Sequence, residues 1–196
     1  MSLRSDANTW GSVTRALHWI SAIFVLFGLV HGLWMTHVLG GTSRLFHYGW
    51  HSQVMIYLGL LVALRVAWRL SEPTPHQPQA STSWEKFAAH AGHIGLYVLL
   101  IAVLLTGYLL WSAFPARFRS NPAITAQLQL TLPGGFSVPA VHDKFDRAAA
   151  RFWEETHKWL SWAMGGLVVL HVLAALRHKF IRHNDIMARM WSGRFS

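Results

Sequence analysis

Four stretches of mostly apolar residues recur along the chain, separated by polar, charged or proline-rich segments. The stretches cover about residues 17–35, 52–70, 93–112 and 158–177. Each is close to the ~20 residues that a helix needs to cross a hydrocarbon core of ~30 Å. Arg65 and Arg69 lie in the last turns of the second stretch, where long side chains can extend to the interface. The pattern predicts an all-α integral membrane protein, a four-helix bundle that forms a single domain over residues 1–196.

The connections between the stretches differ in length and composition. The first is expected to be a short loop that holds Arg44, His47 and Trp50. The second, residues 71–78, reads SEPTPHQP, and no helix is expected to cross these prolines. The third is predicted to be a long extracytoplasmic loop over residues 113–156. Its end, residues 144–155, is expected to form a short amphipathic helix.

Composition agrees with lipid as the solvent. Only 13% of the residues are charged, against about 25% in an average soluble domain, and 53% are hydrophobic. Cysteine is absent, which excludes disulfides, iron–sulfur clusters, thiolate haem ligands and covalent c-type haem attachment. The basic residues flank apolar stretches and form no single patch, so no nucleic-acid partner is expected. No cleavage site follows the first apolar stretch, which is therefore predicted to be a permanent helix.

Positive charges are distributed unevenly over this topology. With both termini in the cytoplasm, ten Lys and Arg residues fall on that side and seven on the other, which favours this orientation. The seven outer cations are Arg44, Arg117, Arg119, Lys144, Arg147, Arg151 and Lys158. Such charge can steer a small anion toward the protein. The same segments also hold Asp143, Asp146, Glu154 and Glu155. A solvated, partly neutralised interface is therefore the simpler explanation.

Histidines inside the apolar stretches are the candidates for chemistry, because a polar ring in hydrocarbon must find a partner. His157 and His171 are 14 residues apart. On a helix this spacing returns to nearly the same face, about 21 Å further along the axis. His18 begins the first stretch on the side of His171, and His51 begins the second on the side of His157. The spacing predicts two pairs, His18 with His171 and His51 with His157.

Two histidines that face each other across a bundle can bind haem iron axially. Two neutral nitrogens without a carboxylate or thiolate make a poor zinc site. A haem with both axial positions filled is suited to outer-sphere electron transfer. Ala163, Gly165 and Gly166 would let a flat macrocycle approach the fourth helix, although ordinary small-residue packing explains them equally well. An interhelical hydrogen bond is the alternative for any one histidine alone.

The remaining histidines are interpreted mainly as polar interface residues. His31 lies 13 residues after His18, roughly on the opposite helix face, and is not expected to share its site. His47 precedes His51 by four residues and is an alternative ligand. His93 and His178 are candidates for a quinone or proton-carrying site. No catalytic residue is assigned.

Several short motifs also follow one another along the chain in a characteristic order. The first stretch carries Leu17-His18-Trp19, and the second runs from His51 to Trp68-Arg69 before a Pro-x-Pro turn. The later motifs are His90, His93, Leu96-Tyr97, Thr106-Gly107-Tyr108, Thr156-His157, the run from Leu170 to Leu176, His178, Asn184-Asp185 and Arg189-Met190. From about Trp10 to Arg194 the chain resembles the bacterial cytochrome b561 family. The third loop is longer than in the compact members of that family.

The resemblance implies two haem b groups in a four-helix bundle of the bacterial inner membrane, with quinone as redox partner. It places the iron ligands at His18, His51, His157 and His171, the residues that the spacing pairs. Some members are similar to superoxide oxidase, which implies superoxide as donor and ubiquinone as acceptor. The alternative function is a haem-bearing membrane anchor or electron relay of a larger dehydrogenase or hydrogenase complex, with a subunit of that complex or a periplasmic redox partner as the electron donor. A metal transporter is disfavoured because the stretches lack the Asp, Glu and Cys ligands of an ion pathway.

Overall fold

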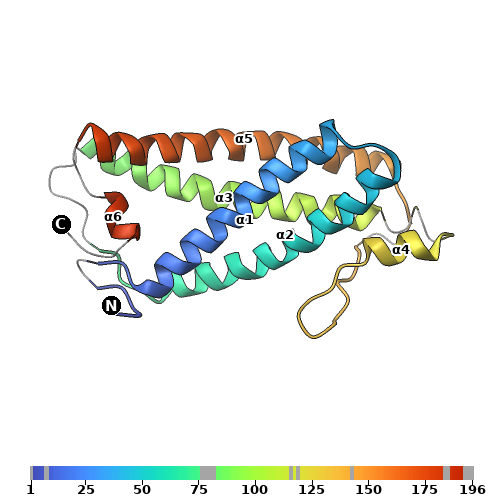
Figure 1. The fold of residues 1–196 in the computed structure, drawn as a ribbon, viewed down its shortest axis with the longest axis horizontal. Coiled ribbons are helices and arrows are strands. Elements are labelled where there is room, and N and C mark those ends of the chain that lie inside the picture. Colours follow the sequence, from blue (N-terminus) through green and yellow to red (C-terminus); the bar gives the residue numbers. More distant parts are fainter. Residues whose placement is uncertain are drawn as a thin grey trace. The chain divides into compact units, whose positions relative to one another are not determined.

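The computed structural model describes residues 2–6, 9–75, 83–114, 117, 120–141, 144–182 and 186–191. The helices of this part are α1 (Ser12–His37), α2 (Gly41–Leu70), α3 (Ser83–Ala113), α4 (Pro122–Leu128), α5 (Arg147–Phe180) and α6 (Ile186–Trp191), as Figure 1 shows. Among these residues no strand forms, and Thr131 and Ser137 make one isolated antiparallel bridge. The expected all-α fold is confirmed. Several residues used above lie outside the described residues, namely 76–78, Arg119, Asp143, Asn184, Asp185 and Arg194.

Helices α1, α2, α3 and α5 are each long and apolar enough to cross a membrane. Their outward surfaces carry large apolar side chains, such as Val30, Val98 and Leu170, which are 66%, 60% and 63% exposed. Such exposure over whole helices is unfavourable in water, whereas a lipid environment makes it favourable. The expectation of four spanning helices is therefore confirmed by length and composition.

The chain divides into two compact units, and each contains one segment of every long helix. The first unit comprises Met1–Ala22, Leu61–Val98 and Met164–Ser196. The second comprises Ile23–Leu60 and Leu99–Ala163. The predicted pair His18 and His171 belongs to the first unit, and the pair His51 and His157 belongs to the second.

The loop expected between the first two spans is mostly helical. Only residues 38–40 connect α1 to α2, and Gly41 opens α2 with a φ of 56°, a conformation that glycine adopts without strain. Arg44, His47 and Trp50 therefore lie in the first turns of α2. The prediction of a loop there was wrong, because hydropathy marks only the apolar part of a helix. One consequence is that His47 and His51 share one face of α2, four residues apart.

The fourth span likewise begins earlier than its apolar stretch. The Asp146 side chain accepts hydrogen bonds from the backbone N–H groups of Ala148 and Ala149, at 2.8 and 3.2 Å, which caps the start of α5. The segment expected to be a separate amphipathic helix is thus largely the beginning of α5, a continuous helix of 34 residues. His157 consequently sits three turns inside a helix and not at its end.

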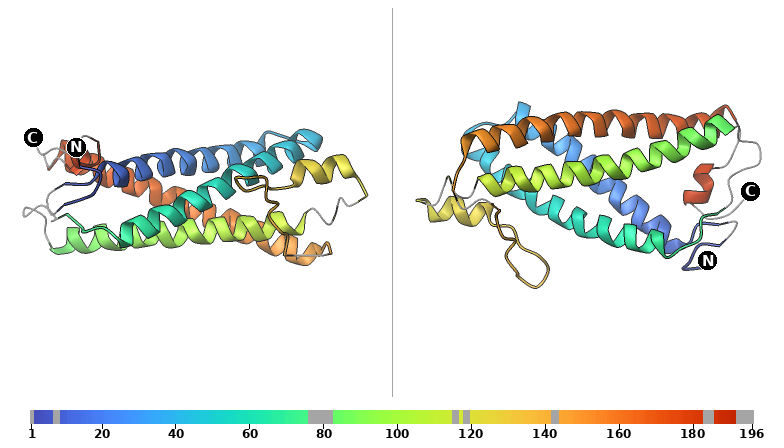
Figure 2. Two further views of the ribbon diagram at one scale, coloured as in Figure 1. Left: turned by 90° about the horizontal axis from the view of Figure 1, so that it is seen from below. Right: turned by 180° about the vertical axis from the view of Figure 1, so that it is seen from behind.

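The described residues of the long third connection lie against α2 and α3 of the second unit (Figure 2). The Gln53 side chain donates to the Thr131 carbonyl at 2.8 Å and accepts from the Thr131 N–H at 2.9 Å. The Trp111 indole N–H donates to the Leu128 carbonyl at 2.7 Å. Leu128 and Leu130 are almost completely buried. This connection is therefore packed as part of the fold of its unit.

The N-terminal segment folds back over the start of α1 in the first unit. The Ser12 and Val13 N–H groups donate to the carbonyls of Ser2 and Leu3, at 3.1 and 3.4 Å. Buried Glu72 accepts from the Ser5 N–H at 2.7 Å, so the segment is also tied to the end of α2. In the same unit α6 lies beside α1 (Figure 1), where the Trp19 indole N–H donates to the Met190 carbonyl.

Gly11 is the tightest point of this N-terminal arrangement. A Cβ atom at Gly11 would lie 2.4 Å from the Leu3 carbonyl oxygen and 2.5 Å from the Arg4 carbonyl carbon. Because backbone must move to admit it, Gly11→Ala is expected to cost about 1–3 kcal/mol of stability. Thermal unfolding in detergent and proteolysis of the N-terminus measure the effect. Gly40→Ala is the control, since its Cβ meets nothing within 4 Å; equal unfolding temperatures for the two variants would contradict the packing described.

Candidate functional site

In the first unit, α1 and α5 bring together the imidazoles of His18 and His171. Their ring centroids are 6.4 Å apart, with the ring planes tilted by 58°. Metal–imidazole nitrogen bonds of about 2 Å place the ring centroids of two ligands on opposite sides of one ion about 6 Å apart. The separation therefore fits two rings that share a metal ion between them.

Helix α3 adds a third imidazole to this site. The His93 ring lies 5.5 Å from that of His171, at 75° to it. His93 is thus a direct neighbour of a predicted ligand. Among the described residues, no hydrogen bond or ring contact joins it to His178, its predicted partner in a quinone or proton site. Nδ1 of His178 is buried without a hydrogen-bond partner. The structure brings His93 to the site and leaves the role of His178 a prediction.

Arg65 of α2 points at the same site. Its guanidinium donates to Nδ1 of His18 at 2.9 Å and lies 5.2 Å from the ring centroid of Tyr97. The side chain is half-buried. From the sequence, the Arg65 side chain was expected to extend to the membrane interface, and this contact was not predicted. The available signal was a cation inside an apolar stretch, residues 52–70, that contains no acidic residue.

In the second unit, His157 of α5 is held in one tautomer by backbone. Its Nδ1 lies 3.1 Å from the Val103 carbonyl oxygen and 3.3 Å from Oγ1 of Thr106. The Thr106 hydroxyl itself donates to the Ala102 carbonyl at 2.8 Å. Because a carbonyl oxygen only accepts, the His157 proton resides on Nδ1. Nε2 is then unprotonated and free to bind a metal, the arrangement that metal-binding histidines commonly adopt.

Gly107 of α3 provides the space for this ring. A Cβ atom at position 107 would lie 3.0 Å from Cε1 and 3.3 Å from Nδ1 of His157. Gly107→Ala is therefore expected to push the imidazole out of line with the Val103 carbonyl, at a cost of about 1–3 kcal/mol. The measurable result is weaker binding of whatever group His157 holds, seen as lower occupancy after purification. Gly59→Ala is the control in the same unit, since nothing lies within 4 Å of its Cβ; unchanged occupancy in Gly107→Ala would argue against His157 as a ligand.

His51 of α2 is the fourth predicted ligand, and it contacts another histidine. The rings of His31 and His51 are stacked with centroids 5.6 Å apart and Nδ1 atoms 3.4 Å apart. The other nitrogen of His31, Nε2, lies 3.2 Å from Nδ1 of His47. His51 also interacts electrostatically with His157. His31, interpreted from the sequence as a polar interface residue, is buried and contacts two histidines of α2.

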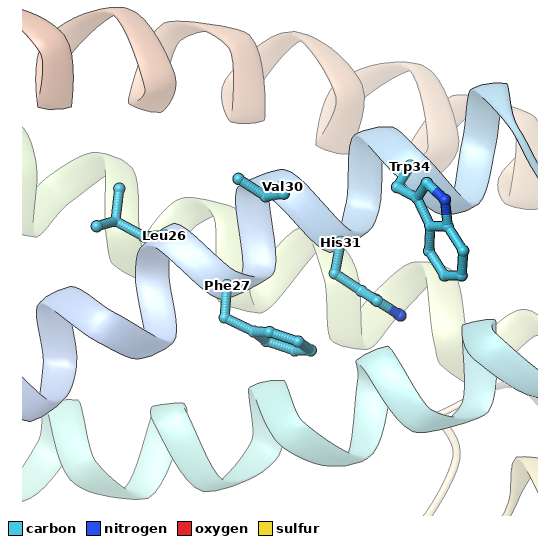
Figure 3. Close-up of a pocket in the computed structure, with 5 residues that line it drawn as sticks. All are labelled: Leu26, Phe27, Val30, His31 and Trp34. Carbon is cyan, nitrogen blue, oxygen red and sulfur yellow. The ribbon is translucent and has the colours of Figure 1, made fainter.

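The rings of His51, His31 and His47 form a chain of hydrogen bonds. If His51 binds a metal, only one assignment of protons satisfies this chain. A neutral ring that binds metal through Nε2 carries its proton on Nδ1. His51 would then donate to Nδ1 of His31, and His31 would donate through Nε2 to His47. Figure 3 shows His31 projecting from α1 between Phe27 and Trp34. These residues, with Leu26 and Val30, line an open apolar hollow of about 410 Å³.

The histidine pair of the first unit fits a planar cofactor better than a bare ion. No group of three or more His, Cys, Asp or Glu side chains in the described residues is arranged to hold a metal ion. Two imidazoles supply only the axial positions of an octahedral iron, so the remaining four ligands must come from a macrocycle. Ideal Cβ atoms at Gly165 and Gly166 meet nothing within 4 Å, which leaves room beside α5 in the first unit. The imidazole pair of the first unit is thus compatible with haem b as the group that it binds.

Comparisons with known proteins agree with this chemistry. The family model described as prokaryotic cytochrome b561 matches residues 9–193. The chain is also similar to the protein named cytochrome b561 homolog 2 of Escherichia coli (strain K12), with 32% identity over 197 residues that cover 97% of this chain and 95% of the relative. The resemblance noted from the sequence is confirmed, and with it haem b binding and electron transfer in a bacterial membrane. The chain belongs to the prokaryotic cytochrome b561 family.

Proposed function

We propose that this protein carries electrons between the quinone pool and a second redox partner through two haem b groups. His51 and His157 would hold one haem in the second unit, and His18 and His171 would hold the other in the first. Haem b with two imidazole ligands supplies a one-electron carrier that exchanges electrons without binding substrate to iron. The observation that carries the proposal is the pair of imidazoles in the first unit at 6.4 Å, matched in the second unit by a His157 ring whose Nε2 is free.

The groups around the second pair support Nε2 as the nitrogen that would bind iron. The Val103 carbonyl holds the His157 proton on Nδ1, and His31 offers Nδ1 to His51. Such second partners orient metal-binding histidines and make them stronger ligands. The outward apolar surfaces of the helices keep the bound groups in a medium of low polarity.

The quinone site is proposed to lie beside the haem of the first unit. His93 carries the argument, because its ring is edge-on to that of His171 and it is exposed. A histidine there can exchange a proton with a quinone oxygen. The ten basic residues assigned above to the termini's side support a cytoplasmic location for both termini, and hence for this unit.

The test of this function is anaerobic reduction of the purified protein by ubiquinol-1, followed at the haem α-band. The proposal predicts that ubiquinol reduces the haems, that ubiquinone reoxidises them, and that His93→Gln slows both reactions without loss of haem. Glutamine keeps a polar side chain that can bind quinone, but it cannot exchange a proton. The variant therefore distinguishes a role of His93 in quinone binding from a role in proton transfer. No redox equilibrium with quinol in the presence of fully bound haem would exclude quinone as partner.

A sharper form of the proposal names superoxide as donor, with ubiquinone as acceptor. The cations that the structure describes in the second unit support it: Arg44, Arg117, Lys144, Arg147, Arg151 and Lys158. Attraction of a small anion to such charge raises the rate of encounter and weakens as salt is added. Superoxide generated in situ is predicted to reduce the haems, more slowly at higher ionic strength. Absence of reduction at low salt would exclude superoxide and leave the quinone proposal standing.

The packed third connection favours a second candidate, a haem-bearing anchor for a larger dehydrogenase or hydrogenase. Its residues 130–138 form a turn in which Gly134 and Gly135 have φ of 89° and 82° and Phe136 is 70% exposed. A turn fixed by its neighbours and carrying an exposed aromatic ring suits docking of a second polypeptide. Co-purification of a second subunit from native membranes, lost in Phe136→Ser, would support this function. Fast haem reduction by a small donor alone would argue against it.

A further inference from the structure

Among the described residues of the first unit, no carboxylate forms an ion pair with the Arg65 guanidinium. The structure describes three carboxylates in this unit, Asp6, Glu72 and Glu85. Glu72 is bound by Ser5 and Arg4, and Glu85 is bound by two arginines of the α5 end, Arg177 and Arg182. Asp6 accepts from both the N–H and the hydroxyl of Thr9. None of them forms an ion pair with Arg65.

An arginine in this position is costly without an anion. Arg65 lies within the membrane-spanning helix α2, and its guanidinium contacts only the His18 ring and Tyr97 among the described residues. Charged side chains in spanning helices are expensive unless they are paired, and an arginine fork is best satisfied by a carboxylate or phosphate. The site beside His18 is therefore set up for a negatively charged group.

Cofactor binding would make this need stronger. Arg65 now donates to Nδ1 of His18, which must accept with a lone pair. If His18 binds iron through Nε2 as a neutral ring, its proton moves to Nδ1, and two donors would face each other at 2.9 Å. The guanidinium must then turn to another acceptor. The haem b macrocycle carries two propionate carboxylates and would arrive next to this same ring.

We propose that Arg65 binds a propionate of the haem held by His18 and His171, and so contributes to retention of that haem. This inference rests on the proposed function. It assigns to Arg65 a role that the histidine ligands alone do not supply, namely recognition of the charged edge of the cofactor. Tyr97, which lies against the guanidinium, would keep the side chain directed into the unit.

The test is the rate at which the holoprotein in detergent loses haem to excess apomyoglobin, with haem b or with haem b dimethyl ester bound. Two release phases are expected for the two haems, and His18→Ala identifies the one that belongs to the first unit. Arg65→Met is expected to accelerate only this phase, by about tenfold to one hundredfold, because a charge-assisted hydrogen bond is lost. Arg65→Lys, which keeps the charge without the fork, should lie between.

The ester provides the decisive comparison. Methylation removes both carboxylate charges, so the difference between wild type and Arg65→Met should disappear, and wild type should release the ester faster than haem b. Arg69→Met is the matched control, since Arg69 contacts the Glu72 carbonyl and Thr74; both phases should stay unchanged. Equal release by wild type and Arg65→Met, or a difference that persists with the ester, would overturn the inference. None of these results changes the number of haems that the protein binds. Failure of the proposed function would be seen differently, as a purified protein that contains no haem.

Discussion

Replacement of His171 by alanine is expected to remove one of two haems and leave the other in place. His171 faces His18 at a ring separation that fits one shared iron, whereas the second pair lies in the other compact unit of the chain. Loss of one axial imidazole leaves iron five-coordinate and weakens retention of the macrocycle. The pyridine haemochrome of His171→Ala should therefore contain roughly half the haem of the wild type per chain.

The control for this experiment is His178→Ala on the same helix, which should keep the full haem content. Half-occupancy in both variants would indicate general destabilisation of α5 and not loss of a ligand. Full occupancy in His171→Ala would mean that another ring, with His93 as the nearest candidate, holds the iron with His18.

Replacement of His51 should have an equally large effect on the second haem, and comparison with His47 tests which of the two is the ligand. His51 has an electrostatic interaction with His157, whereas His47 lies within hydrogen-bond distance of His31. His51→Ala is therefore expected to lose roughly half of the haem. His47→Ala should retain both haems and change only the environment of His31. The reduced α-band and the low-spin electron paramagnetic resonance signals of the two variants measure the difference.

The reverse result, loss of haem in His47→Ala alone, would move the ligand by about one helical turn along the same face of α2. External imidazole adds a check that does not depend on folding. It should restore a six-coordinate spectrum to His51→Ala when haem is supplied, because it replaces the missing axial nitrogen.

Periodicity accounts for much of what could be predicted from the sequence. The hydropathy of four stretches is enough to predict four long apolar helices. The 14-residue spacing of His157 and His171 places them on one face of a helix. The positions of His18 and His51 at the starts of their stretches then predict the two pairs. The structure brings the first of these pairs together, as predicted. That they bind iron stays a prediction.

Other parts of the site depend on features that a pattern along one helix does not contain. His31 of α1 contacts His51 of α2, two helices that are joined by only three residues, and hydropathy does not specify which of their side chains meet. The first turns of α2 and α5 were not predicted to be helical because they are polar. A hydropathy window detects only the part of a helix that lies in the membrane interior. The contact of Arg65 was not predicted because its long side chain can extend toward the membrane interface or toward the other helices. Only the packing of the helices decides between these two directions.

The central claim, that one chain holds two bis-histidine haems b, is tested most directly by counting haem in the purified wild-type protein. The measurement combines a pyridine haemochrome with quantitative amino-acid analysis of one monodisperse detergent sample. The account predicts two haems b per chain with low-spin spectra in both oxidation states. A folded, four-helix protein that holds no haem, or a single haem unaffected by changes at either histidine pair, would contradict it.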